Sequence, residues 1–166
     1  MPGYTGEREY RGYEKTMSYA EVLKVFTEDY KCIPARAHST DAGMDLIASE
    51  SVVLKHGIPT LVKCGIHLEI PEGHVGLIFP RSGLATKRKV TLANSVGVID
   101  SGYRGEVMCS LIYTVDGCIT SVRIDKYERI AQLVILPISL NNPIVVGSLG
   151  ELSETERGVG GFGSTG

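Results

Sequence analysis

A carboxylate, Asp100, and an aromatic ring, Tyr103, lie at a predicted bend between two apolar stretches, within residues 94–106. The first apolar stretch is expected to be a buried strand and consists of Val96, Val98 and Ile99. Turn-forming Asp, Ser and Gly residues follow, and residues 106–113 resume an apolar strand, which predicts a β-hairpin with a loop longer than a tight turn. At the mouth of such a hairpin, Asp100 can activate water beside a ligand that Tyr103 and the backbone hold. Taken alone, an Asp at the end of a strand is more often an Asx-turn residue.

The C-terminal residues 157–166 have a composition that can bind anions. Glycine occupies positions 158, 160, 161, 163 and 166, and successive glycine N–H groups can converge into a nest for anionic oxygens. Arg157 can fork onto a phosphate, Ser164 and Thr165 add hydroxyl donors, and Phe162 offers a ring for a base. The segment lacks the Gly-Lys-[Ser/Thr] ending of a Walker A loop. A glycine-rich terminus is also typical of a frayed chain end, so this stretch alone does not distinguish a lid from a tail.

Three further polar stretches interrupt the apolar pattern and carry groups that bind phosphate or metal. Residues 80–84 place Arg81 and Ser82 at the expected start of a helix, which favours a phosphate site, although Ser there is also an ordinary N-cap. Asp45 follows an Asp-Ala-Gly turn and can hold a hydrated divalent cation, although the stretch alone indicates only a turn. Polar and apolar residues alternate around Gln132, whose side chain would face a ligand or simply solvent.

Composition excludes several functional classes. The chain has 166 residues, enough for one domain with a core. Its formal net charge of −2 gives no basis for general nucleic-acid or membrane binding, and no apolar run approaches the length of a transmembrane helix. The four cysteines and four histidines are scattered, which predicts reduced, partly buried thiols in a cytoplasmic protein and neither a disulfide framework nor a zinc site.

Short apolar stretches separated by Gly, Pro, Asp and Asn clusters predict an all-β fold, either a sandwich or a barrel. Strands are expected at residues 22–26, 52–54, 60–70, 75–79, 90–93, 96–99, 106–113, 119–124, 130–137 and 144–146. One short helix is expected at residues 82–89. We therefore expect an N-terminal arm of unknown role at 1–21, a β domain at 22–150, and a flexible glycine-rich C-terminal lid at 151–166.

In this order, the polar stretches resemble the five motifs of the homotrimeric dUTPase family, and the resemblance covers about residues 22–166. The motifs read Asp-Ala-Gly-Met-Asp-Leu, Pro-Arg-Ser-Gly-Leu-Ala, Asn-Ser-Val-Gly-Val-Ile-Asp-Ser-Gly-Tyr-Arg-Gly, Glu-Arg-Ile-Ala-Gln-Leu and Arg-Gly-Val-Gly-Gly-Phe-Gly-Ser-Thr-Gly. The third and fifth are the most specific. Met44 stands where an aromatic residue is common and Tyr127 where glycine is common, and neither change removes a group that the reaction needs.

The resemblance implies a jelly-roll-like β-barrel or sandwich, a homotrimer with shared active sites, and Mg²⁺-dependent hydrolysis of dUTP to dUMP and pyrophosphate. This reaction would limit uracil incorporation into DNA and supply dUMP for dTMP synthesis. Asp100 would activate water at the α-phosphorus, Tyr103 would leave no room for a 2′-hydroxyl, and Asp45 would orient the water shell of magnesium. The residues implied to bind the substrate are Arg81, Ser82, Gly83, Asn94, Gly97, Val98, Ile99, Tyr103, Val107, Met108, Gln132, Arg157, Gly161, Phe162, Gly163, Ser164 and Thr165.

Two alternatives remain open from the sequence. A dCTP deaminase, or a bifunctional deaminase–dUTPase, has the same fold, but the Asp100–Tyr103 pair and the full glycine tail favour a plain dUTPase. The other alternative is a binding or regulatory protein that keeps the nucleotide site as a sensor and uses its N-terminal arm on a partner. The complete set of catalytic groups argues against a purely binding role.

Overall fold

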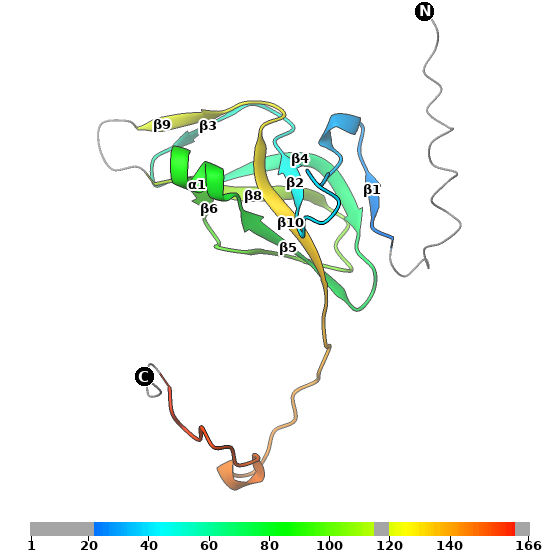
Figure 1. Ribbon diagram of the computed structural model, residues 1–166, viewed down its shortest axis with the longest axis vertical. Coiled ribbons are helices and arrows are strands. Elements are labelled where there is room, and N and C mark those ends of the chain that lie inside the picture. The colour runs from blue at the N-terminus through cyan, green and yellow to red at the C-terminus, as the bar shows by residue number, and fades with distance from the viewer. Residues whose placement is uncertain (1–21, 115–119, 162–166) are drawn as a thin grey trace, which may run out of the picture.

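The computed structural model describes residues 22–114 and 120–161, and eight of the strands there form a sandwich of two four-stranded antiparallel sheets (Figure 1). The first sheet has the strand order β1 (Lys24–Phe26), β4 (Thr60–Glu69), β8 (Glu106–Tyr113) and β6 (Val90–Leu92). The second has the order β2 (Met44–Ile47), β10 (Arg129–Pro137), β5 (His74–Pro80) and β7 (Gly97–Asp100). The remaining elements are the strand pair β3 (Val52–Lys55) and β9 (Ser121–Ile124), the helix α1 (Ser82–Arg88), and the 3₁₀ turns η3 (Tyr30–Cys32) and η4 (Leu149–Glu151). The expected all-β fold with one short helix is confirmed for the part of the chain that the structure describes.

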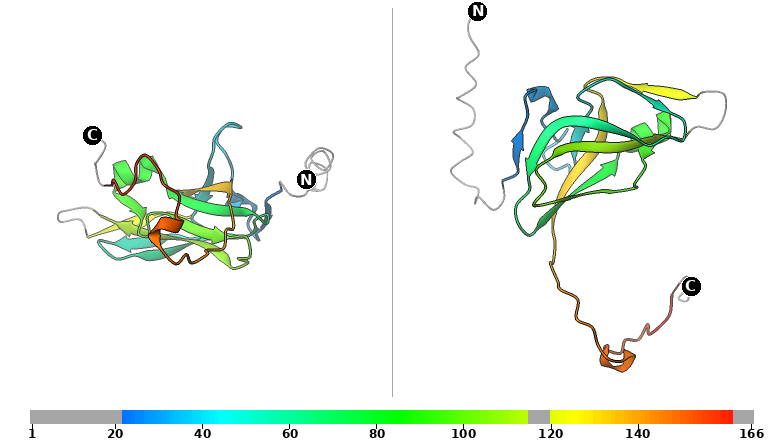
Figure 2. Two further views of the ribbon diagram at one scale, coloured as in Figure 1. Left: turned by 90° about the horizontal axis from the view of Figure 1, so that it is seen from below. Right: turned by 180° about the vertical axis from the view of Figure 1, so that it is seen from behind.

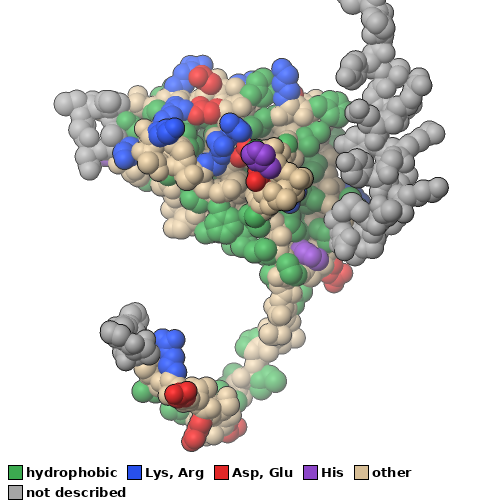
Figure 3. All heavy atoms as spheres, viewed as in Figure 1, with side chains coloured by type: hydrophobic (Ala, Val, Ile, Leu, Met, Phe, Trp, Pro, Cys, Tyr) green, Lys and Arg blue, Asp and Glu red, His purple; other side chains and the backbone are tan. Residues whose placement is uncertain are grey.

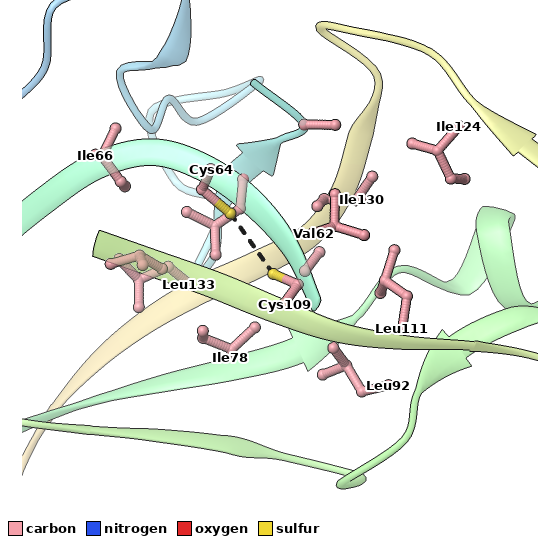
Figure 4. Packing of buried hydrophobic residues seen from close by; sticks show 14 of the residues in the cluster. Val62, Cys64, Ile66, Ile78, Leu92, Cys109, Leu111, Ile124, Ile130 and Leu133 are labelled. Atoms are coloured by element: carbon pink, nitrogen blue, oxygen red, sulfur yellow. Dashed lines mark hydrogen bonds between the residues drawn. The ribbon is translucent and has the colours of Figure 1, made fainter. Parts of the chain in front are cut away.

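Alternation of side chains along the strands builds a core between the two sheets. The buried residues of β8 are every second one, namely Val107, Cys109, Leu111 and Tyr113. Leu111 and Val62 from the first sheet belong to the same buried cluster as Ile78 and Leu133 from the second (Figure 4). Because a shift of one residue would turn each of these side chains to the surface, burial fixes the register and so decides which residues face a ligand.

The cysteines described by the structure are free and buried. Cys64 on β4 and Cys109 on β8 have their sulfur atoms 3.7 Å apart and share an S–H hydrogen bond (Figure 4). This hydrogen bond and, second, burial raise the pKa of the Cys64 thiol above its ordinary value. Since only a thiolate is a good nucleophile, the Cys64 thiol is poorly reactive. The reduced state predicted from the sequence stays a prediction, and Cys118 lies outside the described residues.

Three of the sequence predictions about strands are wrong. The predicted β-hairpin does not form within the described sheets, because β7 pairs with β5 whereas β8 pairs with β4 and β6, so the bend at residues 100–105 connects the two sheets. The turn expected through residues 41–46 ends early, because Met44 starts β2, which pairs with β10 and places Asp45 opposite Gln132. Residues 144–146 were expected to form a strand from their β-branched side chains, yet they extend alone, with Val145 95% exposed. A β-branched sequence forms a strand only where a neighbouring strand can pair with it.

The burial of the strand before the bend also differs from the prediction. Ile99 is buried as expected, but Val98 is 65% exposed. β7 lies at the edge of its sheet and pairs only with β5, so its alternate side chains point away from the core. Val98 therefore lies on the surface beside the bend and can take part in a binding site.

After β10 the chain leaves the sandwich. The Ile138 N–H still donates to the Gly73 carbonyl at 2.8 Å, and residues 139–161 then run away from both sheets (Figure 1 and the right view of Figure 2). The expected boundary between 150 and 151 falls within this segment and stays a prediction, as does the arm at 1–21, which lies outside the described residues. No described helix is both long enough and apolar enough to cross a membrane.

Candidate functional site

A pocket of about 240 Å³ opens between β7 and β8 where the chain bends at residues 100–105, and we call it the hairpin pocket after the hairpin that the sequence predicted there. β7 is an edge strand, and β6 pairs with β8 only over residues 111–113. The backbone groups that face the pocket therefore lack a neighbouring strand within the described sheets, and such an edge presents free N–H and C=O groups. The lining residues are Leu61, Ile78, Asn94, Gly97, Val98, Ile99, Asp100, Tyr103, Glu106, Val107 and Met108. A pocket lined by both apolar and polar side chains, with a hydrogen-bonding edge, suits a flat polar ligand.

The bend places Asp100 and Tyr103 as the sequence predicts, on one pocket. The Tyr103 N–H donates to the Asp100 carbonyl at 3.0 Å, and the Tyr103 hydroxyl donates to the Glu106 carbonyl at 3.0 Å. The Asp100 residue is exposed at the pocket, and no side chain in the described part of the chain pairs with its carboxylate. An unpaired carboxylate keeps its lone pairs for a water molecule, as a general base must.

A second pocket of about 380 Å³, the arginine pocket, lies where β2, β10, the end of β5 and the start of α1 meet. Its lining residues are Ala37, Asp41, Ala42, Gly43, Asp45, Arg81, Ser82, Gly83, Arg129 and Gln132. Lys and Arg side chains gather over α1 on this face of the molecule, with acidic side chains among them (Figure 3). The structure thus brings together the residues predicted to bind phosphate and metal from three separate motifs.

One carboxylate holds two guanidinium groups in this pocket. Asp45 Oδ1 lies 2.9 Å from Arg81 Nε, and Asp45 Oδ2 lies 3.3 Å from Arg129 NH1. Arg81 NH1 also donates to the Arg129 carbonyl at 3.3 Å. A guanidinium carries five N–H donors, so both arginines keep donors for an incoming phosphate while Asp45 fixes their position.

Arg129 was missed as a candidate from the sequence. It lies within the fourth motif, Glu-Arg-Ile-Ala-Gln-Leu, but alternation along that stretch drew attention only to Gln132. The register explains the omission, because a shift between Arg129 and Ala131 in the β10–β2 pairing brings Arg129 beside Asp45. An arginine in a polar motif could have suggested a phosphate-binding residue. The position of the Arg129 side chain, however, depends on the pairing of β10 with β2. Gln132 itself faces the pocket and donates from Nε2 to the Pro80 carbonyl at 3.1 Å.

The start of α1 differs in one detail from the prediction. Arg81 occupies the N-cap position and makes no side-chain capping hydrogen bond, so Ser82 is the first helical residue and not the cap. The Ser82 side chain is exposed at the arginine pocket, beside Gly83. The helix ends at Arg88 because Lys89 takes a left-handed conformation with φ 57°. Because no side chain caps the start of the helix, the first-turn N–H groups and the Ser82 hydroxyl are available to an anion.

Two predicted residues of the C-terminal segment, Arg157 and Gly161, line neither pocket. Arg157 donates from Nε to the Gly160 carbonyl at 2.9 Å, and Gly161 follows in the same exposed segment. Phe162, Gly163, Ser164 and Thr165 lie outside the described residues. The two pockets themselves have no lining residue in common. The predicted base and sugar residues of the hairpin pocket therefore lie on a different surface of the chain from the predicted phosphate residues of the arginine pocket.

The described residues offer no group of three or more His, Cys, Asp or Glu side chains that would enclose a metal ion. A carboxylate has about four lone-pair positions, and the two arginines engage one position on each Asp45 oxygen. Asp45 therefore retains acceptor capacity for a water molecule of a hydrated cation. Magnesium, which keeps several waters and takes few carboxylates, fits such a donor set.

The two departures from the family motifs have simple structural accounts. Met44 is 9% exposed and packs into the core at the start of β2, where bulk and not polarity is required. Tyr127 adopts φ 69°, a left-handed conformation that glycine takes more easily. Its hydroxyl donates to Asp29 Oδ2 at 2.6 Å, which lowers the pKa of that carboxyl, and its ring lies 4.8 Å from the Lys126 ammonium. These contacts hold Tyr127 in the strained turn.

Comparison with known proteins agrees with this geometry. The dUTPase family profile matches residues 29–166. The deoxyuridine 5′-triphosphate nucleotidohydrolase of Mycobacterium marinum is 45% identical over 136 residues, which are 81% of this chain and 87% of that protein. The corresponding protein of Clostridium tetani is 43% identical over 148 residues, 89% of this chain and 97% of its own length.

Solved structures show the same similarity. The dUTPase of Staphylococcus bacteriophage 80alpha with dUpNHpp has a TM-score of 0.79 and 33% identity, covering 88% of this chain and 99% of that one. The dUTPase of phage phi11 of S. aureus, whose structure describes the coordination of a structural Mg(II) ion, has a TM-score of 0.68 and 28% identity over 77% of this chain and 98% of that one. The resemblance seen in the five motifs is thus confirmed, and the chain belongs to the dUTPase family of nucleotide hydrolases.

Proposed function

We propose that this protein hydrolyses dUTP to dUMP and pyrophosphate by attack of an Asp100-activated water at the α-phosphorus. The observation that carries the proposal is the hairpin pocket, where the exposed Asp100 carboxylate lies at the mouth of a slot with a free backbone edge. The names of the relatives support the substrate, since they are called deoxyuridine 5′-triphosphate nucleotidohydrolases, and the 80alpha enzyme was solved with dUpNHpp.

The base would lie in the slot and be read by the backbone. Uracil has a planar edge of alternating acceptors and a donor, which matches the free groups of an unpaired strand edge. We assign this edge to Gly97, Val98 and Ile99 on β7 and to Val107 and Met108 on β8, with the Asn94 side chain at one end. Cytosine would leave buried polar groups without partners, which costs about 10⁴-fold in selectivity. The thymine methyl group would be excluded by the narrow slot.

The sugar would pack on Tyr103. The ring is 42% exposed and lines the hairpin pocket beside Asp100. Its hydroxyl is tied to the Glu106 carbonyl, so the ring has a fixed place under a deoxyribose. A ribose 2′-hydroxyl would meet the ring without gaining a hydrogen bond there. Tyr103 is therefore proposed as the residue that excludes UTP.

The chemical step uses one proton acceptor on this chain. Asp100 accepts a proton from a water molecule as the water oxygen forms a bond to the α-phosphorus. The bond from that phosphorus to the bridging oxygen breaks, and pyrophosphate leaves with the bonding electron pair. Phosphoryl transfer is promoted chiefly by positioning of the reacting groups and by neutralisation of charge. The arginine pocket would supply both, by holding the phosphates with its guanidinium groups.

The phosphate chain would be held by Arg81, Ser82, Gly83 and Gln132, with Arg129 as an additional donor. Asp45 places the two guanidinium groups, at 2.9 Å from Arg81 Nε and 3.3 Å from Arg129 NH1. We further propose Mg²⁺ as the cofactor, held mainly by the triphosphate, with Asp45 orienting its water shell. When bound, the ion would neutralise charge on the phosphate oxygens.

A complete site would combine different subunits of a homotrimer. This part of the proposal is supported by two observations: the pockets have no lining residue in common, and the C-terminal segment leaves its own sandwich. That segment carries apolar side chains with little cover, such as Leu140 at 72% and Ile144 at 88% exposed, which would be buried against another copy. Its end, with Arg157, Gly161, Phe162, Gly163, Ser164 and Thr165, would close over the γ-phosphate and the base.

The experiment that tests this function is an assay of pyrophosphate release from dUTP, UTP, dTTP and dCTP with Mg²⁺ present. We expect dUTP to be the preferred substrate, with dCTP discriminated by about 10⁴-fold in kcat/KM. Chromatography of the dCTP reaction would detect any uracil-containing product. Comparable release from all four nucleotides would contradict the proposal, and conversion of dCTP to a uracil nucleotide would identify a deaminase instead.

A further inference from the structure

The bend that carries Asp100 and Tyr103 is fastened to a neighbouring strand, β4, whose contacting residues lie outside the family motifs. The β4–β8 pairing runs regularly from Thr60↔Leu111 to Lys63↔Met108, then shifts, and resumes at His67↔Glu106. β4 therefore bulges between positions 63 and 67, and such a bulge leaves backbone groups without ladder partners. The bulge faces the start of β8, directly after the bend.

Glu106 satisfies one of these groups with its side chain. The Gly65 N–H, at the bulge, donates to Glu106 Oε1 at 3.1 Å. Gly65 has φ 66°, and a Cβ atom there would lie 2.9 Å from the Ser49 Cβ, so the bulge requires glycine at this position. The bulge is thus a fixed anchor, and the Glu106 carboxylate is the group that reaches it.

A second contact fastens the bend itself. His67 Nδ1 lies 2.9 Å from the Arg104 carbonyl, and because a carbonyl only accepts, Nδ1 carries the proton and donates. Arg104 in turn donates from NH1 to the Ser101 carbonyl at 2.6 Å and to the Tyr103 carbonyl at 2.8 Å. The bend is therefore stiff within itself and is tied to β4 at two points.

Glu106 connects this anchor to the Tyr103 ring. Its backbone carbonyl accepts the Tyr103 hydroxyl at 3.0 Å while its side chain holds the β4 bulge. The ring lies over Gly105, where a Cβ atom would overlap it. One residue thereby links the β4 bulge to the ring that lines the pocket beside Asp100.

We propose that Glu106 is a positioning residue for sugar discrimination: by holding the β4 bulge, it fixes the Tyr103 ring where a ribose 2′-hydroxyl would lie. This inference rests on the proposed function, in which Tyr103 packs under the deoxyribose. The Glu106 side chain acts through the ring and needs no contact with the nucleotide. Glu106 acts by placing the acceptor Oε1 within hydrogen-bond distance of the Gly65 N–H, which requires a side chain as long as glutamate. The negative charge of the carboxylate is less important.

The test compares kcat/KM for dUTP and UTP in a set of variants. Glu106→Ala removes the acceptor, and Glu106→Asp keeps the charge but is one methylene too short to reach the Gly65 N–H. In both, we expect the dUTP/UTP ratio to fall by about 10- to 100-fold, the scale of a misplacement of about 1 Å. Glu106→Gln keeps an acceptor of the same length and should retain a ratio close to wild type. Glu69→Ala, which removes an exposed carboxylate of β4 that pairs with Lys24, is the matched control.

A double variant shows whether Glu106 acts through Tyr103. Tyr103→Ala alone should lower the ratio most, and adding Glu106→Ala should lower it no further. An unchanged ratio in Glu106→Ala and Glu106→Asp, with both substrates slowed equally, would overturn the proposal, as would additive losses in the double variant. A Glu106→Gln variant as unselective as Glu106→Ala would also refute it. Wild-type enzyme in the same assay separates the two claims, since failure to prefer dUTP there would count against the proposed function itself.

Discussion

Replacing Asp100 with Asn is expected to abolish most hydrolysis of dUTP while nucleotide binding persists. The amide keeps the shape of the side chain but accepts a proton poorly, so kcat should fall by about 10²- to 10⁴-fold, the usual contribution of a general base. Asp100 lies at the hairpin pocket beside Tyr103 without a described side-chain partner, so its loss breaks no ion pair. Titration with a non-hydrolysable dUTP analogue, followed by calorimetry, should give an affinity near that of wild type.

The control for this variant is Asp125→Asn. Asp125 is an exposed carboxylate outside both pockets that pairs with Arg123 at 2.6 Å. It should retain nearly full turnover, since surface ion pairs of this kind contribute little to stability. Turnover of the Asp100→Asn enzyme within a few-fold of wild type, with Mg²⁺ present, would show that another group activates the water.

A mixture of two inactive variants is expected to regain activity. One variant carries Asp100→Asn with an intact C-terminus, and the other lacks residues 157–166 but keeps Asp100. Each homotrimer alone should be nearly inactive, because every site lacks one of the two groups. After refolding together in equal amounts, subunits of a cyclic trimer mix at random, and about a quarter of the sites would pair a good Asp100 with a good C-terminus. Activity should rise to about that fraction of wild type.

The physical basis of this expectation is the separation of the two pockets on one chain and the departure of residues 139–161 from the sandwich. Subunit exchange must be demonstrated, for instance by differently tagged chains recovered in one trimer. Exchanged trimers that stay inactive would mean that Asp100 and the C-terminus of a working site belong to the same chain. That result would refute the shared site and leave the role of Asp100 untouched.

The strands that build the pockets were largely predictable because alternation is strict where one face is buried. β8 was expected at 106–113 and spans those residues, since burial of every second side chain fixes its register. The helix was expected at 82–89 and ends one residue earlier, where Lys89 takes a left-handed conformation. The local sequence is therefore sufficient to predict the positions of these strands, of the helix and of the bend with Asp100 and Tyr103.

Pairing between distant strands could not be read from the sequence. The turn-forming residues of the first motif do not predict β2. Only the pairing of β2 with β10 shows that Asp45 lies opposite Gln132. The same pairing brings Arg129 to Asp45, which local alternation does not indicate. Likewise, the β4 bulge that receives Glu106 arises from a shift in register between two strands. Long-range register is a property of the packed sheets and not of any short segment.

The most direct test of the proposed reaction is hydrolysis of dUTP in water enriched in ¹⁸O, with enzyme in excess so that each substrate is turned over once. Mass spectrometry of the two products then locates the phosphorus that water attacked. Attack at the α-phosphorus predicts one ¹⁸O atom in dUMP and none in pyrophosphate. Label in pyrophosphate would mean attack at the β-phosphorus and would contradict the placement of the α-phosphorus beside Asp100.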